Sequence, residues 1–324
     1  MPVSTRLAAT GIVATLALAV ASPGQAQDYP SRPIRVIVPY SAGGGADNAA
    51  RVIAQRLGTA LHTQVVIDNR PGASGIIGAQ AVVQAAPDGY TVLYDASTYA
   101  VNPALRKMPF DPDKDLVPVS LAITVPNILV VHPDAPYKSF KEFVDYARQH
   151  PGKVSYASYG AGSPAHLVGE LLKSQAGIDM LHVPYKGGAP ALADVMGGQV
   201  NAYFANAASG LSYVQSGRLK ALAVTSAKRM AALPDTPTIA ENGFKNFEVL
   251  EWNGFFVPKG TPAAVVDRLA REVKAAVQDP DTRAKLNKLG LDTVGSTPAE
   301  FAGFIQGETR RWKDLARTNK ITVE

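Results

Sequence analysis

The sequence contains no cysteine, so its fold cannot rest on disulfide bonds and it holds no cysteine-ligated metal. Its five histidines lie on separate predicted elements. His166 and Glu170 stand four residues apart without the H-E-x-x-H arrangement of a zinc helix. We therefore expect neither a metal nor any other cofactor.

Blocks of like charge are also missing. There are 32 Lys and Arg residues against 27 Asp and Glu residues, a net charge of +5, and the cations are scattered. A protein that follows a phosphate backbone concentrates its cations on one face or in one run. We therefore expect no nucleic-acid partner, and the small positive excess weakly favours an anionic solute.

Long apolar runs are absent except at the N-terminus. There the run from Leu7 to Ala21 follows Arg6 and ends at Ser22-Pro23-Gly24, too short to span a bilayer. A small-residue exit at Ala26 completes the pattern of a cleavable signal peptide over residues 1–26. No cysteine stands at the exit for a lipid anchor, so the sequence predicts a freely exported mature protein.

Catalytic motifs are missing too. Gly72-Ala73-Ser74-Gly75 is one residue short of G-x-S-x-G. Residues 160–165 match G-x-G-x-x-G/A, but the acidic residue that a dinucleotide site needs after the next strand is not there. The sequence therefore offers no visible chemistry for an enzyme.

What the sequence does show is an alternation of short β-rich runs with helical runs, which is typical of βαβ units. The alternation forms two series, and we expect each to build one lobe, a mostly parallel sheet flanked by helices. The first series has strands at 34–40, 64–69 and 91–96, and the second has strands at 128–133, 153–158, 180–185, 200–205 and 219–226.

Two extended segments, 111–133 and 247–260, connect these series and predict two hinge crossings. We assign residues 27–127 and 247–324 to the first lobe and residues 128–246 to the second. Paired crossings permit two lobes to close on a ligand.

The first candidate binding segment is the glycine-rich loop after the first strand. Its glycines let the backbone approach a guest, and the following helix start attracts anions. No Lys-Ser/Thr pair follows the glycines, which disfavours a polyphosphate. A plain strand-to-helix turn is the alternative. The candidate residues are Tyr40, Ser41, Gly43, Gly44 and Asp47.

The second candidate segment opens a helix of the second series. Ser163 has the position of an N-cap, with Pro164 as the first helical residue. Two such segments facing each other across a cleft could hold a carboxylate from both sides. The candidate residues are Ser158, Gly160, Gly162, Ser163 and His166, with Tyr185 and Asn206 at the ends of neighbouring strands.

Eight segments in this order resemble the substrate-binding proteins of tripartite tricarboxylate transporters, the Bug or TctC-like family. They are YPSRPIRVIVPYSAGGGAD (29–47), NRPGASGIIGA (69–79), APDGYTVL (86–93), YASYGAGSPAHLVGELL (156–172), HVPYKGGAPALADVMGGQV (182–200), LKALAVTSAKR (219–229), LPDTPTIAENG (233–243) and WNGFFVPKGTP (252–262).

The resemblance implies an α/β, two-lobed periplasmic-binding-protein fold of type II, the Venus-flytrap arrangement. It implies a periplasmic protein that binds organic acids or amides and delivers them to membrane permease subunits. In such proteins the two loops hold a ligand carboxylate, often through water. The distal part of the ligand would contact Tyr40, Ser97, Thr98, Asn206 and Trp252.

The sequence leaves the ligand open among dicarboxylates, tricarboxylates and aromatic carboxylates. Asn201 and Ala205 stand where the family commonly has acidic residues, which disfavours a cationic ligand. Tyr40, Tyr99 and Trp252 suggest an aromatic acid, although packing at the hinge is an equal interpretation of Trp252. We expect a monomer. A secreted serine-type hydrolase and a ligand-presenting partner of a two-component sensor remain the alternatives.

Overall fold

A computed structural model describes residues 29–319 and 321. Its strands form one continuous sheet in the order β2-β1-β3-β9-β4-β7-β5-β6, and β8 and β10 also pair with β4. The strands are β1 (Ile34–Val38), β2 (Val65–Asn69), β3 (Thr91–Ala96), β4 (Leu116–Val131), β5 (Val154–Ser158), β6 (Met180–Pro184), β7 (Ala202–Asn206), β8 (Lys220–Val224), β9 (Leu250–Pro258) and β10 (Asp292–Thr293).

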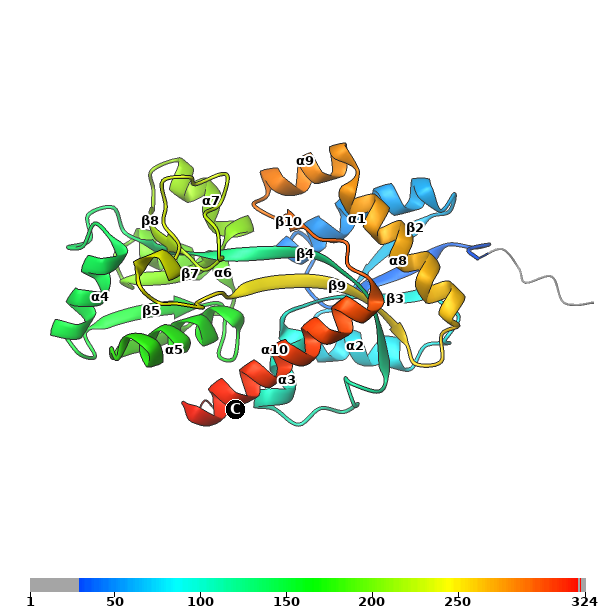
Figure 1. Ribbon diagram of the computed structural model, residues 1–324, viewed down its shortest axis with the longest axis horizontal. Helices are drawn as coiled ribbons and strands as arrows, with labels where there is room; N and C mark the ends of the chain where they lie inside the picture. Colours follow the sequence, from blue (N-terminus) through cyan, green and yellow to red (C-terminus); the bar gives the residue numbers. More distant parts are fainter. Residues whose placement is uncertain (1–28, 320, 322–324) are drawn as a thin grey trace, which may run out of the picture.

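Helices flank the sheet in both lobes (Figure 1). They are α1 (Gly45–Ala60), α2 (Ile76–Val83), α3 (Thr98–Leu105), α4 (Phe140–Gln149), α5 (Pro164–Ala176), α6 (Gly188–Met196), α7 (Ala207–Gln215), α8 (Ala263–Gln278), α9 (Pro280–Lys288) and α10 (Pro298–Thr318), with short 3-10 turns η1 (Ala73–Gly75) and η2 (Ala240–Asn242).

Strand β4 belongs to both lobes. Its first part, to Pro126, pairs with β9, and its last part, from Asn127, pairs with β7 and β8. Strand β9 then returns to the first lobe and pairs with β3. Figure 1 shows β4 and β9 as the two long strands that run from one lobe to the other. The two predicted crossings and the two-lobed α/β fold are therefore confirmed.

The sheet is less parallel than predicted. Strand β1 pairs in parallel with β2 and β3, and β5 pairs in parallel with β6 and β7. Both crossing strands add antiparallel pairs, because each runs through the middle of the sheet against the direction of its neighbours. Parallel order is thus confined to the βαβ units, as their crossover geometry requires.

The last helix, α10, contacts both lobes. It begins with a capping box between Thr297 and Glu300, packs on α3 and β4, and approaches α5. At its end the side-chain Nδ2 of Asn319 donates to the carbonyl oxygen of Glu170, 3.3 Å away. The C-terminal helix therefore joins the lobes a third time, outside the sheet.

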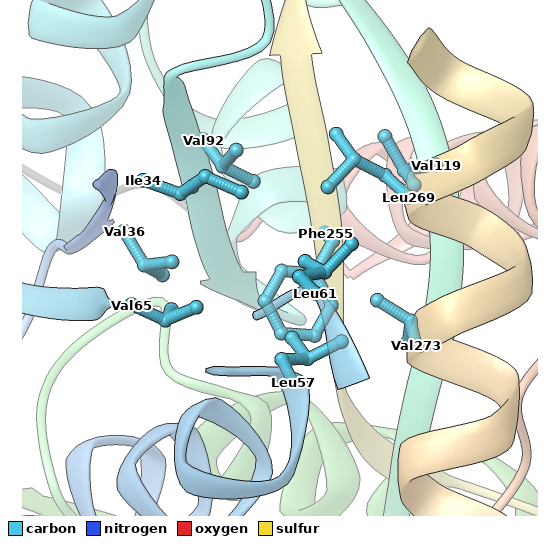
Figure 2. Close-up of a pocket in the computed structure, with 10 residues that line it drawn as sticks. All are labelled: Ile34, Val36, Leu57, Leu61, Val65, Val92, Val119, Phe255, Leu269 and Val273. Atoms are coloured by element: carbon cyan, nitrogen blue, oxygen red, sulfur yellow. The ribbon is translucent and has the colours of Figure 1, made fainter. Parts of the chain in front are cut away.

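A cavity of about 10 Å³ lies in the core of the first lobe. Figure 2 shows its ten lining side chains, all of them apolar, on β1, β2, β3, β4, β9, α1 and α8. A buried water needs polar partners, which this lining does not provide. The cavity is therefore a small packing defect in the core and carries no ligand chemistry.

No helix in residues 29–319 has the length and apolar character needed to cross a bilayer. The signal peptide expected over residues 1–26 lies outside the described residues.

Candidate functional site

The carboxyl ends of β1, β3, β5 and β7 converge where β4 and β9 cross between the lobes. The strand registers establish this: Ala96 pairs with Asn253, and Asn127 pairs with Asn206. Glu251 lies opposite Val125 on β4. Open α/β sheets bind ligands outside such carboxyl ends. The crossing point is therefore the candidate site.

The glycine loop of the first lobe is held by Asp47. This carboxylate accepts hydrogen bonds from the Gly43 N–H at 2.8 Å, from Arg51 Nε at 2.9 Å and from Asn69 Nδ2 at 2.9 Å. Burial alone would raise the pKa of Asp47, but these donors hold it below its usual value. Asp47 is only 1% exposed. The donors to Asp47 are all internal, so this carboxylate positions the loop, and its contact with a ligand stays a prediction.

The loop itself is open to solvent. Ser41, Gly43 and Gly44 are exposed, and Gly44 caps α1 without a side chain. The first-turn N–H groups of a helix lack partners within the helix, and the positive end of the dipole lies there. A Cβ placed on Gly45 would lie 3.8 Å from Cβ of Ala208 in α7. The start of α1 thus faces the second lobe at the start of α7.

Tyr40 and Thr98 are tied together beside a buried carboxyl group. The Tyr40 hydroxyl donates to Oδ1 of Asp95 at 2.7 Å and contacts Oγ1 of Thr98. Asp95 is 2% exposed, and burial raises its pKa to about 7. Ser97 Oγ is buried without a hydrogen-bond partner among the described residues. Of these side chains, Ser97 has the most unused hydrogen-bonding capacity.

The second loop is shaped by its own hydrogen bonds. Ser163 Oγ accepts from the His166 N–H at the start of α5, so Ser163 is the N-cap that the sequence predicts. The Gly162 N–H donates to His166 Nδ1 at 3.1 Å. Gly160 and Gly162 have φ of +149° and +74°, which favours glycine. The Gly160 N–H in turn donates to Ser158 Oγ at 3.2 Å, so the N–H groups of both glycines are used within the second lobe.

Ser158 and His166 take part in an internal cluster. Ser158 Oγ lies 2.9 Å from the Gly160 carbonyl oxygen and 2.7 Å from His182 Nε2. The His166 and His182 rings stack with centroids 3.8 Å apart and planes 7° apart. Burial, with a smaller contribution from His166, lowers the pKa of His182 to about 3, and burial also lowers the pKa of His166. Both imidazoles are therefore neutral near pH 7.

A pair of residues joins the second loop to the hinge. The Tyr159 hydroxyl donates to Glu251 Oε2 at 3.0 Å, while Glu251 Oε1 is buried without a partner in the described part of the chain. Both side-chain polar atoms of Asn127 are likewise unpartnered there. Burial raises the pKa of Glu251 to about 7, and Tyr159, Asn206 and Asn127 offset part of that rise.

Sequence reasoning missed Asp95, Asn127, Tyr159 and Glu251. For Glu251 a signal was present, since it is the one acidic residue of a mostly apolar crossing segment, LEWNGFFVP (250–258). No such signal marks Asn127, because its role depends on the register of β4 with β7.

Two further predicted residues have side chains that make contacts within the protein. Trp252 is 0% exposed and packs edge-on against Phe301 and Phe304 of α10. Its burial favours the interpretation that it packs the hinge, and its contact with a ligand stays a prediction. Tyr185 donates to Asp194 Oδ2 at 2.6 Å within its own lobe.

Two of the three aromatic side chains that suggested an aromatic ligand are packed in the interior. Besides Trp252, Tyr99 is buried and stacks on Phe256 with centroids 4.4 Å apart. Only Tyr40 keeps a place beside the site.

Asn201 and Ala205, which stand where the family commonly has acidic residues, both have internal roles. Asn201 Oδ1 accepts from the Ser155 N–H at 2.8 Å, and Ala205 is buried in β7. Glu251 instead supplies an acidic group at the hinge. Among the described residues no cluster of His, Asp and Glu has the arrangement of a metal site.

Comparisons with known proteins agree with this geometry. The family model described as "Tripartite tricarboxylate transporter family receptor" matches residues 49–321. Three solved structures are similar over 89–91% of this chain and 99–100% of their own. They are the periplasmic binding protein BugD (35% identical, TM-score 0.80), Rpa4515 of R. palustris with adipate (36%, 0.83) and MatC of Rhodopseudomonas palustris with bound malate (32%, 0.77).

Proposed function

This chain belongs to the tripartite tricarboxylate transporter receptor family, and we propose that it captures a small dicarboxylate between its lobes and presents it to membrane permease subunits. It is a solute-binding protein and not an enzyme. The proposal goes beyond family membership in naming the ligand class and the residues that hold it.

The observation that supports this function best is the meeting of the exposed first turn of α1 with the start of α7 beside the hinge. Backbone N–H groups at helix starts bind carboxylates without reorganisation. We place one carboxylate of the ligand beside Ser41, Gly43 and Gly44 and against the first-turn N–H groups of α1, because the Gly43 and Gly44 N–H groups already bond to Asp47 and Ser41. The Gly160–Gly162 segment lies opposite in this proposal, and bridging water completes the contacts.

The chemistry of the solved relatives supports a dicarboxylate. Rpa4515 was solved with adipate and MatC with malate, and both ligands have two carboxyl groups. An aromatic carboxylate is less well supported, because Tyr99 and Trp252 are packed in the interior.

The hydrolase alternative has one structural feature in its favour, the contact of Ser158 with His182. Ser158 is 0% exposed, however, and a histidine whose pKa is lowered to about 3 is a poor general base near neutral pH. Labelling by a fluorophosphonate probe would revive this alternative.

The remaining parts of the proposal concern organisation. We take residues 27–127 with 247–324 as one lobe and residues 128–246 as the other, with β4 and β9 as the hinge. The mature chain, cleaved near Ala26, would act as a monomer in the periplasm. Transfer to a permease and presentation to a sensor would use the same closed complex.

Calorimetric titration tests the function. The protein is first unfolded, dialysed and refolded to remove any bound solute, and then titrated with adipate, malate, citrate, benzoate and the monocarboxylate hexanoate. We expect heat of binding and a raised melting temperature with a dicarboxylate, since a ligand at 100 times Kd adds about 2.7 kcal/mol of stability. No response to any of the five acids would contradict the proposal.

A further inference from the structure

We propose that Glu251 contacts the ligand and shares a proton with the second carboxyl group of a bound dicarboxylate. This inference rests on the proposed function and assigns the far end of the same site. It follows from the position of Glu251, from the groups that surround it and from the charges that are missing there.

Glu251 lies in the hinge between the two lobes. It stands on the crossing strand β9, and its Oε2 is bonded to Tyr159, the residue that follows β5. Oε1 is withdrawn from solvent and makes no hydrogen bond to the described residues, although Asn127 and Asn206 lie near enough to the carboxyl group to lower its pKa. A buried oxygen left without a hydrogen bond costs free energy unless a ligand or water satisfies it. This oxygen is therefore available to a guest in the hinge.

Two amide side chains accompany it. Asn127 has both side-chain polar atoms buried and unpartnered among the described residues. Asn206 uses Oδ1 to cap α7 through the Ala208 N–H, and its Nδ2 is the donor that lies toward Glu251 and lowers the pKa of that carboxyl group. Asn127 and Asn206 are paired across β4 and β7, so their side chains share one side of the sheet. Amide donors beside a carboxyl group suit a guest with carboxyl oxygens.

The charges around Glu251 determine whether this residue and a ligand carboxyl group next to it hold a proton. Within the described residues no Lys or Arg pairs with it, and its titratable neighbours are Tyr159 and Tyr203 in the second lobe. Tyr40, beside Asp95 in the first lobe, also interacts with Tyr159. A ligand carboxylate placed here would be a second negative charge without a cation. Two carboxyl groups in such a site retain one proton between them.

In the ligand-free protein Glu251 can already hold the proton. Because burial raises the pKa of Glu251 to about 7, the neutral acid and the carboxylate coexist near neutral pH. Below that value the acid already carries the proton, and above it the complex must take one proton from the buffer. Binding of a dicarboxylate should therefore weaken as the pH rises above 7, in the pattern of linked protonation.

The arrangement also predicts selectivity. A monocarboxylate of equal length leaves Glu251 Oε1 and Asn127 without partners, whereas the second carboxyl group of a dicarboxylate satisfies them. Sites that hydrogen-bond a polar group reject analogues that lack it. Hexanoate should therefore bind at least about tenfold more weakly than adipate.

The test is titration of the full protein with adipate at pH 6, 7 and 8, in two buffers of different ionisation enthalpy. For a group with a pKa of about 7, we expect affinity to fall by about tenfold from pH 6 to pH 8 and one proton to be taken up at pH 8. The proton count requires no variant. A constant affinity with no proton uptake would overturn the inference.

Glu251→Gln provides the matched variant, since its amide mimics the protonated acid. It should bind adipate at pH 6 within about threefold of the wild type and show no dependence on pH up to 8. Loss of binding at pH 6 would show that the negative charge is needed. An unchanged pH dependence would assign the proton to another group, such as Asp95. Glu248→Gln, on the exposed side chain three residues earlier, is the control and should leave the profile unchanged.

These outcomes separate the two proposals. If adipate and malate fail to bind at any pH, the proposed function fails. If either binds without linked proton uptake, only the role of Glu251 fails.

Discussion

The hydroxyl of Tyr159 donates a hydrogen bond of 3.0 Å to Oε2 of Glu251, and this bond joins the loop after β5 to the strand that crosses between the lobes. Residues far apart in the sequence thereby fix the position of the second loop relative to the hinge. The remaining oxygen of Glu251 makes no hydrogen bond to the described residues and lies near Asn127 and Asn206.

Tyr159→Phe should therefore destabilise the protein and perturb the acid. We expect a loss of about 1–2 kcal/mol in the free energy of unfolding, measured by urea titration, because a buried hydrogen bond is removed. The pKa of Glu251 should also rise further, since Tyr159 lowers it. Carbon-13 NMR of the glutamate carboxyl groups can follow that shift. Tyr213→Phe is the control, and it should change stability by less than about 0.5 kcal/mol.

Gly44→Val should remove ligand binding while the protein remains folded. The φ of Gly44 is −74°, which suits any residue, and a Cβ there would meet only the Ser41 carbonyl oxygen at 3.3 Å. The valine methyl groups would cover the N–H groups at the start of α1. Loss of one or two charge-assisted bonds of about 1.5–3 kcal/mol each corresponds to a decrease in affinity of roughly a hundredfold.

Calorimetry with adipate, together with a circular dichroism spectrum, checks this prediction. Gly303→Ala on α10, where a Cβ meets nothing within 4 Å, is the control. Wild-type affinity in Gly44→Val would reduce the first loop to a structural turn.

Trp252→Ala should lower the free energy of unfolding. The indole is fully buried between β9 and α10, and truncation of a large core side chain costs about 3–5 kcal/mol. We expect the urea midpoint to fall, with a smaller decrease for Trp252→Phe. Normal stability combined with lost adipate binding would instead place Trp252 at the ligand.

The stacked pair of His166 and His182 should make the folded state sensitive to acid. The pKa of each is lowered on folding, so the unfolded chain binds more protons once the pH falls below about 6.5. Each fully neutral histidine then removes up to about 1.4 kcal/mol of stability per pH unit. Asp95 and Glu251 have the opposite sign, because their raised pKa lets the folded state bind protons first.

The two effects oppose each other between pH 6.5 and 5, and we expect a shallow stability profile there. His182→Gln removes one histidine contribution, so its unfolding free energy should rise relative to the wild type as the pH falls through this range. Urea titrations at pH 6.5, 5.7 and 5.0 measure the difference. Parallel profiles for the two proteins would contradict neutral burial of His182.

The pattern of the sequence predicted the two series of strands and helices, the crossings and the two glycine loops. These features depend on local chemistry: apolar alternation, glycine at left-handed positions, and an N-cap serine followed by proline. Ser163 confirms the last of these, since it caps α5 where the sequence places it.

Three features depended on tertiary structure: the inward orientation of Asp47, the burial of Trp252 under α10, and the place of Glu251 beside Tyr159 and Asn127. The last two are set by which distant strand or helix packs against the residue, whereas Asp47 is held by Gly43 and Arg51 of its own segment as well as by Asn69 of β2. A local pattern shows that a strand has two faces, but only the packed sheet determines which face meets the other lobe and which meets a helix.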